Sequence, residues 1–352
     1  MAETSSILKK DDASAYKLPA QDCVKISLEV VKEGDGSEAI NPPPFTPDFC
    51  HQHFGDNEEI FGYTEPLLKL RYSSATLDLF IQFSHKGLVS DKFPDLGVDD
   101  VVSKVREHIP WPILPNIDAF NKALEGQAEF KPPGELIHQY TQAEERAFQV
   151  YKVENGSELV KRVQSFALWY VDAAWYLDED DDRWHFYLSF EKIRVDAGDR
   201  YIVVGYIACY NYYAYPEHMR PRIGQALVLP PYRRGGHGVE LLLCLYKDLV
   251  PNPKVIDITV EDPSEYFVAM RDAVDAANCA SLASFSPEKL GGGFSTEIFQ
   301  EAHQRLKLDK AQIRRCYEIL RLKASRSTPE EMKAFRLDVK NRLNAPFKAM
   351  PP

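Results

Sequence analysis

Hydrophobic and polar residues alternate in several stretches of the first 140 residues, as they do in strands with one buried face. The alternation is plain in CVKISLEVV (23–31) and in LKLRYSSATLDLFIQF (68–83). Helical spacing of apolar residues instead predicts short helices at 46–55, 98–109 and 117–124. This part of the chain is therefore expected to form a mixed α+β domain.

From about Phe148 the pattern changes to a regular alternation of strands and helices. Two long apolar strands, RWHFYLSFEKI (183–193) and YIVVGYIACYNYYAY (201–215), flank RVDAGDR (194–200), which is typical of a hairpin turn. Helices between strands require some parallel pairing, and the central hairpin makes the sheet mixed. The remaining strands are expected at 148–153, 225–229 and 255–260, and the helices at 158–177, 239–249 and 264–277.

After residue 284 the chain is mostly helical, with two capping-box signatures, Asp309 with Gln312 and Thr328 with Glu331. KPPGELI (131–137) is expected to link the first region to the second. We therefore expect an N-terminal mixed α+β domain at 1–140, a central sheet domain at 141–283 and a small helical domain at 284–352.

Charge changes this picture by suggesting what the chain binds. Hydrophobic content of 44% and charged content of 27% are those of a globular protein. The net charge of −11 is uneven: residues 301–352 carry 13 Lys and Arg against 6 Asp and Glu, whereas the preceding residues carry 29 against 47. The acidic part argues against general binding to nucleic-acid phosphates and would attract a basic partner. The basic C-terminal helices are interpreted as solvated faces, with contact to nucleic acid or an acidic partner as the alternative.

Six scattered cysteines without a CxxC pair indicate thiols used as small apolar residues in a reducing compartment. His51 and His53 form an HQH pair with no further clustered ligands, so we expect no metal. The polar start of the chain does not resemble a signal peptide. The most apolar helical stretch, 158–177, is too polar for a bilayer span, and a soluble intracellular protein is expected.

The sequence PPYRRGGHGVELLLC (230–244) places arginines and glycines between an expected strand and an expected helix. Arg233, Gly236 and Gly238 are spaced as R-x-x-G-x-G. Glycines let the backbone approach a ligand, and the free amides and dipole at a helix start attract anions such as pyrophosphate. The spacing differs from that of the Rossmann fingerprint and the Walker lysine motif. A sharp turn with no ligand is the alternative.

This turn resembles the acetyl-CoA signature of the GNAT acetyltransferase superfamily, Q/R-x-x-G-x-G/A between a strand and a helix. Longer stretches narrow the resemblance to the family of histone acetyltransferase type B catalytic subunits. The resemblance implies an α+β fold with a GNAT-type mixed central sheet flanked by helices, in which 141–283 is the acetyl-CoA-binding catalytic domain. The stretches that carry it, between about His51 and Leu343, are HQHFGDNEEIFGY, DDDRWHFYLSFEK, VGYIACYNYYAYPE, RPRIGQALVLPPYRRGGHG, VIDITVEDPSEYFVAMRD, RRCYEILRL and FRLDVKNRL.

The same resemblance implies that acetyl-CoA is the co-substrate and that no metal takes part. The backbone amides of the turn would bind the pyrophosphate of CoA, and the preceding strand would contact the pantetheine arm. Cofactor contacts are therefore expected at Leu227, Val228, Leu229, Arg233, Arg234, Gly235, Gly236, His237 and Gly238.

ITVEDPSE (258–265) ends an expected strand with two adjacent carboxylates, whose side chains would point to opposite faces. Asp262 could instead cap the helix that begins near Ser264. The resemblance implies that Glu261 is the general base and that Asp262 takes part. It also implies a third acidic residue from the helix at 158–177, Asp172, where the relatives carry glutamate; the shorter side chain leaves that role open.

The resemblance places contacts with the substrate tail in YNYYAY and GDNEE, although aromatic strands are more often packing. The resemblance also implies that the substrate is the N-terminal tail of newly made, free histone 4 and that the partner is a WD40-propeller histone chaperone. It implies work in the cytoplasm and nucleus, without direct binding to DNA or membranes. The rivals are a GNAT enzyme with another amine acceptor, a histone-tail binding module without turnover, and a helix-turn-helix DNA binder, which the acidic charge disfavours. The expected substrate contacts are Asp56, Asn57, Glu58, Tyr210, Asn211 and Tyr212.

Overall fold

The computed structural model describes residues 13–31, 41–142, 145–195 and 198–348. Residues 1–12 of the polar start and the tip of the expected hairpin, residues 196–197, lie outside these ranges. Two compact units divide the chain: residues 1–207 with 226–237 (unit 1), and residues 208–225 with 238–352 (unit 2). Strands β11 (Gly198–Ala214) and β12 (His218–Val228) have residues in both units. The domain boundaries expected after residues 140 and 283 stay predictions.

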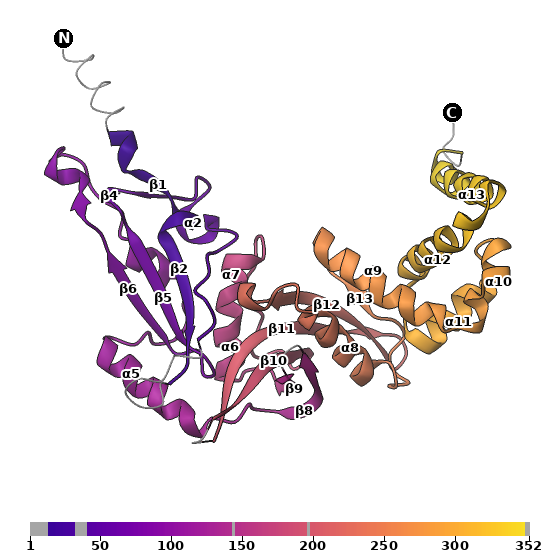
Figure 1. Ribbon diagram of the computed structural model, residues 1–352, viewed down its shortest axis with the longest axis horizontal. Coiled ribbons are helices and arrows are strands. Elements are labelled where there is room, and N and C mark those ends of the chain that lie inside the picture. Colours follow the sequence, from indigo (N-terminus) through magenta and orange to yellow (C-terminus); the bar gives the residue numbers. More distant parts are fainter. Residues whose placement is uncertain (1–12, 32–40, 143–144, 196–197, 349–352) are drawn as a thin grey trace, which may run out of the picture. The chain divides into compact units, whose positions relative to one another are not determined.

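The N-terminal part of unit 1 contains small sheets. Strand β2 (Val24–Glu29) pairs in parallel with β5 (Leu67–Ser73), which pairs antiparallel with β6 (Leu79–Ser84), and Figure 1 shows the three side by side. Buried and half-buried residues alternate along β2, which confirms the expected strand. The shorter pairs are β1 (Lys17–Pro19) with β3 (Glu59–Phe61), and β4 (Tyr63–Thr64) with β7 (Gly87–Leu88).

Short helices connect these strands. The helix expected at 46–55 shortens to α3 (His51–Phe54), because the backbone N–H groups of Asp48 and Phe49 donate to the Trp169 carbonyl instead of to a helical acceptor. Gly55 ends α3 at a φ of 77°, a conformation that favours glycine. The other helices here are α2 (Ala20–Cys23), α4 (Val101–Arg106), capped by Asp100, and α5 (Ile117–Gly126), capped by Asn116.

The largest sheet described has the strand order β13-β12-β11-β10-β9-β8. Strand β9 pairs antiparallel with both β8 and β10, whereas β12 and β13 are parallel, so the expected mixed sheet with flanking helices is confirmed. Its other strands are β8 (Glu135–Gln142), β9 (Arg146–Glu154), β10 (Trp184–Val195) and β13 (Thr259–Val260). The linker expected at 131–137 is shorter than predicted, since β8 already begins at Glu135.

Two elements differ from their sequence-based predictions. The strand expected at 255–260 shrinks to β13, because Val255 and Ile258 form isolated bridges with two different partners, Met219 and Leu308. The helix expected at 158–177 ends early, as α6 (Glu158–Val163), a 3-10 turn (Gln164–Phe166) and α7 (Ala167–Tyr170). Val171 is extended and Ala173 has a φ of 51°, so Asp172 lies in a turn after α7 and not on a helix.

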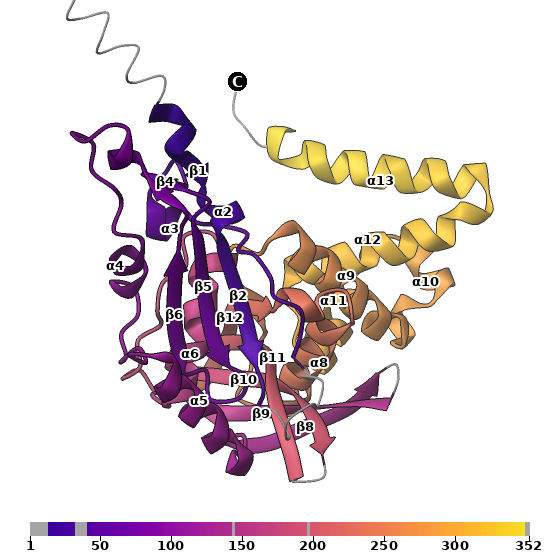
Figure 2. The same cartoon turned by 60° about the vertical axis from the view of Figure 1, so that its left-hand side comes forward.

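Unit 2 contains most of α8 (His237–Leu249) and all later helices. Ser264 caps α9 by accepting from the N–H of Phe267, so the alternative of Asp262 as the cap is wrong. Asp309 caps α12 as predicted, with its carboxylate accepting from the N–H groups of Ala311 and Gln312. Figure 2 shows α13 running back after α12. The later helices are α9 (Glu265–Ala280), α10 (Pro287–Gly291), α11 (Thr296–Leu306), α12 (Lys310–Ala324) and α13 (Pro329–Lys348).

All six cysteines are buried, as expected for thiols used as small apolar residues. Cys279 and Cys316, for example, lie in the apolar core of unit 2 with Ile313 and Tyr317. Within the described ranges, no helix is both long enough and apolar enough to span a bilayer.

Candidate active site

The glycine turn lies between the end of β12 and the start of α8. A short 3-10 helix (Pro230–Tyr232) leads into it, and Arg234 and Gly236 then take positive φ values of 64° and 84°. Gly235 and Gly236 are exposed. A Cβ at Gly235 would lie 3.0 Å from the His237 ring, so glycine fits closely there. The turn therefore presents bare backbone at the first residues of a helix.

The residues on either side of the glycines, Tyr232 and His237, are fixed by contacts with other side chains of unit 1. Tyr232 is buried and its hydroxyl donates to Glu191 Oε2 at 2.8 Å, while Arg146 Nε donates to Glu191 Oε1 at 2.7 Å. Burial raises the pKa of the Tyr232 hydroxyl, so it stays a hydrogen-bond donor. The expected ligand His237 is only 3% exposed, with Nδ1 2.8 Å from the Tyr140 hydroxyl, so its side chain is packing and only its backbone faces the turn.

The two arginines of the turn differ. Arg233 Nη1 lies 2.7 Å from Asp48 Oδ2, and its guanidinium carbon lies 5.0 Å from the centre of the Tyr170 ring. Its Nε also donates to the Val228 carbonyl at 3.2 Å. Arg233 thus ties the turn to the segment before α3, whereas Arg234 is exposed and has a left-handed backbone conformation.

The expected cofactor strand ends where two backbones approach closely. The N–H of Leu229 donates to the Val204 carbonyl at 2.9 Å. A Cβ on Gly205 would lie 2.2 Å from the Leu227 carbonyl oxygen and 2.9 Å from Val228 Cα, so only glycine fits there. Leu227 and Leu229 are buried as whole residues and Val228 is half-buried, so Val228 is the part of this strand end that is open to a ligand.

Glu261 and Asp262 are in unit 2, directly after β13. The N–H of Glu261 donates to the Ile223 carbonyl at 2.9 Å, which continues the parallel pairing of β12 and β13 by one residue. Asp262 has a φ of 32°, so the chain turns sharply between the two carboxylates. Both residues are exposed. The expected general base is therefore an exposed carboxylate fixed by its backbone at a strand end.

The expected aromatic contacts lie on the part of β11 that belongs to unit 2. Tyr210 and Tyr212 meet edge to face with ring centres 4.7 Å apart. Arg222 on β12 lies 4.9 Å from the centre of the Tyr212 ring, and its Nε donates to Thr259 Oγ1 at 3.4 Å. Asn211 Oδ1 is buried without a hydrogen-bond partner. One face of Tyr212 thus already binds a cation, and Asn211 keeps an acceptor oxygen unused.

The expected residues of GDNEE lie in unit 1, after α3. Asp56 and Asn57 are exposed. Glu58 is engaged within the protein: its Oε1 accepts from the N–H groups of Cys50 and His51, each at 2.9 Å, and lies 3.3 Å from His51 Nδ1. The hydrogen bond from Cys50 is the main reason that the pKa of Glu58 is lowered. Asp172 Oδ1 lies 3.4 Å from His51 Nε2. Two expected site residues of unit 1, Glu58 and Asp172, therefore contact the same histidine.

The expected site residues therefore form two sets. Unit 1 holds the turn and strand end that contain Leu227 and Gly236, together with Asp56, Asn57, Glu58 and Asp172; unit 2 holds Glu261, Asp262, Tyr210, Asn211 and Tyr212. Sequence reasoning missed His51 and Arg222. In the sequence the HQH pair suggests only metal ligands, and no local pattern marks Arg222 as the neighbour of a tyrosine on the next strand.

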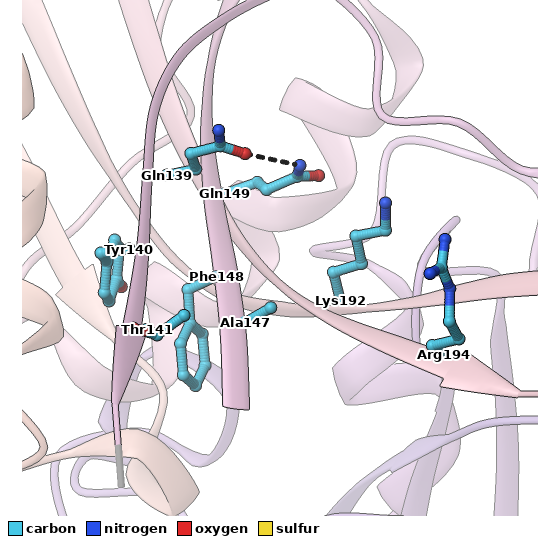
Figure 3. Close-up of a pocket in the computed structure, with 8 residues that line it drawn as sticks. All are labelled: Gln139, Tyr140, Thr141, Ala147, Phe148, Gln149, Lys192 and Arg194. Atoms are coloured by element: carbon cyan, nitrogen blue, oxygen red, sulfur yellow. Dashed lines mark hydrogen bonds between the residues drawn. The ribbon is translucent and has the colours of Figure 1, made fainter. Parts of the chain in front are cut away.

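A separate hollow of about 530 Å³ opens on strands β8, β9 and β10 of unit 1 (Figure 3). Gln139 and Gln149 bond across it at 3.5 Å, and Lys192 and Arg194 lie at its other end. Lys192 is already paired with Asp199 at 2.8 Å. None of the expected site residues lines this hollow. Among the described residues, no group of three or more His, Cys, Asp and Glu side chains could hold a metal ion.

Comparison with known proteins shows which family this chain resembles. Residues 16–172 match the family described as "Histone acetyl transferase HAT1 N-terminus", and residues 271–322 match "Histone acetyltransferase type B catalytic subunit, C-terminal". The histone acetyltransferase type B catalytic subunit of Homo sapiens is 39% identical over 314 residues, which cover 86% of this chain and 75% of the relative. A histone acetyltransferase type B catalytic subunit from Dictyostelium discoideum is 32% identical over 320 residues, which cover 86% of this chain and 67% of the relative.

Solved structures with partial similarity are also acetyltransferases. Arabidopsis thaliana Naa50 with a bisubstrate analogue is 20% identical, covers 32% of this chain and 70% of that chain, and has a TM-score of 0.25. An aminoglycoside acetyltransferase from a soil metagenome is 12% identical, covers 36% and 86%, and has a TM-score of 0.27.

The mixed sheet, the glycine turn that opens a helix and the family matches define an acetyltransferase of the GNAT class, whose co-substrate is acetyl-CoA. The chain belongs to the family of histone acetyltransferase type B catalytic subunits. It is accordingly a histone acetyltransferase.

Proposed function

We propose that this acetyltransferase modifies lysines in the N-terminal tail of newly made, free histone 4, with Glu261 as the general base. The observation that carries the proposal is the exposed backbone of Gly235 and Gly236 at the start of α8, in a chain of the type B family.

In this proposal the glycine turn binds the pyrophosphate of acetyl-CoA. The first N–H groups of a helix have no acceptor within the helix, and the helix dipole adds a partial positive charge at that end. Arg234 supplies the side-chain charge, since Arg233 is already paired with Asp48. Because Tyr232 and His237 are fixed by buried contacts, binding requires little rearrangement of the turn. Backbone groups of Leu227, Val228 and Leu229 line the pantetheine arm.

The acceptor lysine sets the main chemical barrier. Its ammonium has an ordinary pKa of about 10.4, so making it neutral at pH 7 costs roughly 4–5 kcal/mol. A carboxylate that removes this proton, directly or through water, lowers the barrier. Glu261 suits this role because it is exposed and its backbone is fixed at a strand end, while Asp262 and Asp172 are the other acidic candidates.

Once Glu261 has taken the ammonium proton, the neutral amine attacks the thioester directly. The acetyl–nitrogen bond forms, the carbon–sulfur bond breaks, and the second proton of the nitrogen passes to the departing CoA sulfur. Thiols ionise near pH 8.5, so the departing CoA sulfur needs less assistance than the amine. No covalent intermediate on the protein is needed, and the burial of all six cysteines supports this route.

Charge supports a basic tail as the substrate. Residues 1–300 carry 29 Lys and Arg against 47 Asp and Glu, which raises the local concentration of a basic peptide. Tyr210, Asn211, Tyr212, Asp56 and Asn57 are proposed to line the peptide path. A WD40-propeller histone chaperone as partner, and work in both the cytoplasm and the nucleus, belong to the same proposal and rest on family membership.

The test is CoA release from acetyl-CoA with a histone 4 tail peptide, comparing the parent chain with Glu261→Gln. We expect the variant to be slower by about a hundredfold or more, the scale of a lost general base. Glu265→Gln is the matched control, because Glu265 is an exposed glutamate in the first turn of α9 and should leave the rate unchanged.

Each other outcome contradicts a defined part of the proposal. Equal rates for the parent and Glu261→Gln would remove Glu261 from its role. Release with other amines but not with the tail peptide would overturn histone 4 as the acceptor. Peptide binding without any release would leave a tail-binding module in place of an enzyme.

A further inference from the structure

His51 is held between two carboxylates in unit 1. Its Nδ1 lies 3.3 Å from Glu58 Oε1 and its Nε2 lies 3.4 Å from Asp172 Oδ1. Glu58 is a fixed acceptor, since the same Oε1 also receives the N–H groups of Cys50 and His51. The Phe49 ring stands edge-on to the imidazole at 5.9 Å. The ring is therefore oriented by Glu58 on one side and directs its second nitrogen at Asp172.

The turn that carries Asp172 is bound to α3 at a second point. Gln52 Nε2, from the residue after His51, donates to the Ala174 carbonyl at 2.5 Å. Asp172 itself is three-quarters exposed, with a side-chain accessibility of 75%. An exposed aspartate in a turn has several rotamers open to it, and the His51 contact selects one of them. The turn and its carboxylate are thus both positioned from α3.

We propose that His51 is a positioning residue for Asp172, donating from Nε2 to Asp172 Oδ1 while its Nδ1 is anchored on Glu58. The inference rests on the proposed function, in which Asp172 is one of the acidic groups at the reaction. It also reassigns Glu58: its oxygen Oε1 serves to orient His51, and Asp56 and Asn57 are left as the substrate contacts of that segment.

Both ring nitrogens face carboxylate oxygens, which accept but cannot donate when ionised. Asp172 therefore meets the ring at Nε2, the nitrogen that Glu58 does not hold.

Two isosteric variants separate the contacts of the ring. Gln places an amide nitrogen near the position of Nε2 and keeps the donor to Asp172, whereas Asn places one near Nδ1 and keeps only the donor to Glu58. We expect His51→Gln to retain kcat within about threefold and His51→Asn to lose up to about tenfold, the scale of one hydrogen bond. KM for acetyl-CoA and the midpoint of thermal unfolding should stay the same in both variants.

A double-mutant cycle shows whether His51 acts through Asp172. In an Asp172→Asn background, His51→Asn should cause no further loss of kcat. Effects that multiply would overturn the inference, because His51 would then act elsewhere. Activity retained by His51→Asn and lost by His51→Gln would also overturn it, since the contact with Glu58 would then be the one that matters.

A readout independent of turnover keeps the two proposals apart. Asp172→Asn should shift the ¹⁵N resonance of His51 Nε2, and Asp56→Asn, at an exposed neighbouring carboxylate, should not. An unmoved resonance would show that the contact is absent and that the inference is wrong, whatever the activity. Failure of the proposed function would instead leave this shift in place, with no CoA release by the parent chain.

Discussion

The glycine turn of unit 1 and the strand end at Glu261 in unit 2 are built in different ways. The turn rests on buried polar contacts, in which Glu191 accepts from both Tyr232 and Arg146. Glu261 is held by one backbone hydrogen bond to Ile223, and its side chain is exposed. In the proposed roles, the binding surface for a large, constant ligand is fixed in advance, whereas a proton acceptor that meets varied lysines has to stay open to solvent and substrate. Mutations around the glycine turn should therefore affect mainly stability, and mutations around Glu261 should affect mainly turnover.

The largest effect on stability is expected from Gly205→Ala. The added Cβ would lie 2.2 Å from the Leu227 carbonyl oxygen, and a backbone atom cannot yield as a flexible side chain can. We expect a loss of about 3 kcal/mol in the free energy of unfolding, together with weaker acetyl-CoA binding. Urea unfolding and calorimetric titration measure the two. Gly97→Ala is the control, because a Cβ there meets nothing within 4 Å; equal losses in both variants would contradict the close approach.

Glu191→Gln should destabilise unit 1 by about 2 kcal/mol, since the buried Tyr232 hydroxyl and the Arg146 guanidinium would both lose a charged acceptor. Thermal unfolding measures the loss. Glu297→Gln removes an exposed carboxylate paired with Lys289, and it should change stability by less than about 0.5 kcal/mol. A small effect of Glu191→Gln would show that the contacts of Glu191 with Tyr232 and Arg146 do not stabilise the turn.

Acid should weaken the N-terminal part of unit 1 through His53. This ring is buried and stacked on Trp169 with ring centres 3.8 Å apart, and burial lowers its pKa to about 3. In the unfolded chain an ordinary histidine gains its proton near pH 6.5. Because the unfolded state then binds the extra proton, the free energy of unfolding falls by about 1.4 kcal/mol for each pH unit below 6.5, down to about pH 3.

His53→Phe keeps a ring on Trp169 and removes the titrating group, so the fall in unfolding free energy with acid should be shallower by that amount. Urea unfolding between pH 7 and pH 5 measures the slope. His85→Gln removes an exposed histidine and should leave the slope unchanged. Parallel slopes for the parent and His53→Phe would show that His53 is protonated in the folded protein.

The smallest change in stability is expected among the exposed site residues of unit 2. Tyr212 is 41% exposed and contacts Tyr210 and Arg222, so Tyr212→Ala should cost less than about 1 kcal/mol. KM for the histone tail peptide should rise while KM for acetyl-CoA stays the same. A large loss of stability without a change in KM would mean that Tyr212 is packing and that the two sides are not as different as proposed.

Much of the fold could be predicted because local patterns carry it. Alternation marks β2, and Asp309 caps α12 by bonds within its own first turn. The early end of α7 could not be predicted, since the Trp169 carbonyl accepts from Asp48 and Phe49, far away in the sequence. Asp172 consequently lies in a turn, in a place that periodicity alone does not indicate.

The candidate site shows the same limit. R-x-x-G-x-G marks the exposed turn, but the sequence does not distinguish Arg233, which is tied to Asp48, from Arg234, which is exposed. It also presents His237 as a possible ligand, although Tyr140 and Phe148 on other strands bury that ring. Glu58 is similar, since its partners become visible only when α3 is folded. Partners distant in sequence decide what each of these side chains can still do.

The burial of all six cysteines makes the chain suited to site-specific labelling. Maleimide dyes react with exposed thiolates, and burial raises the pKa of Cys23 to about 11 and that of Cys50 to about 12. A new cysteine at an exposed position such as Asp118 in unit 1, and another at Leu343 in unit 2, could carry a donor and an acceptor dye without removal of any native cysteine. Energy transfer between the dyes would then report, in solution, how far apart the two units lie with and without acetyl-CoA.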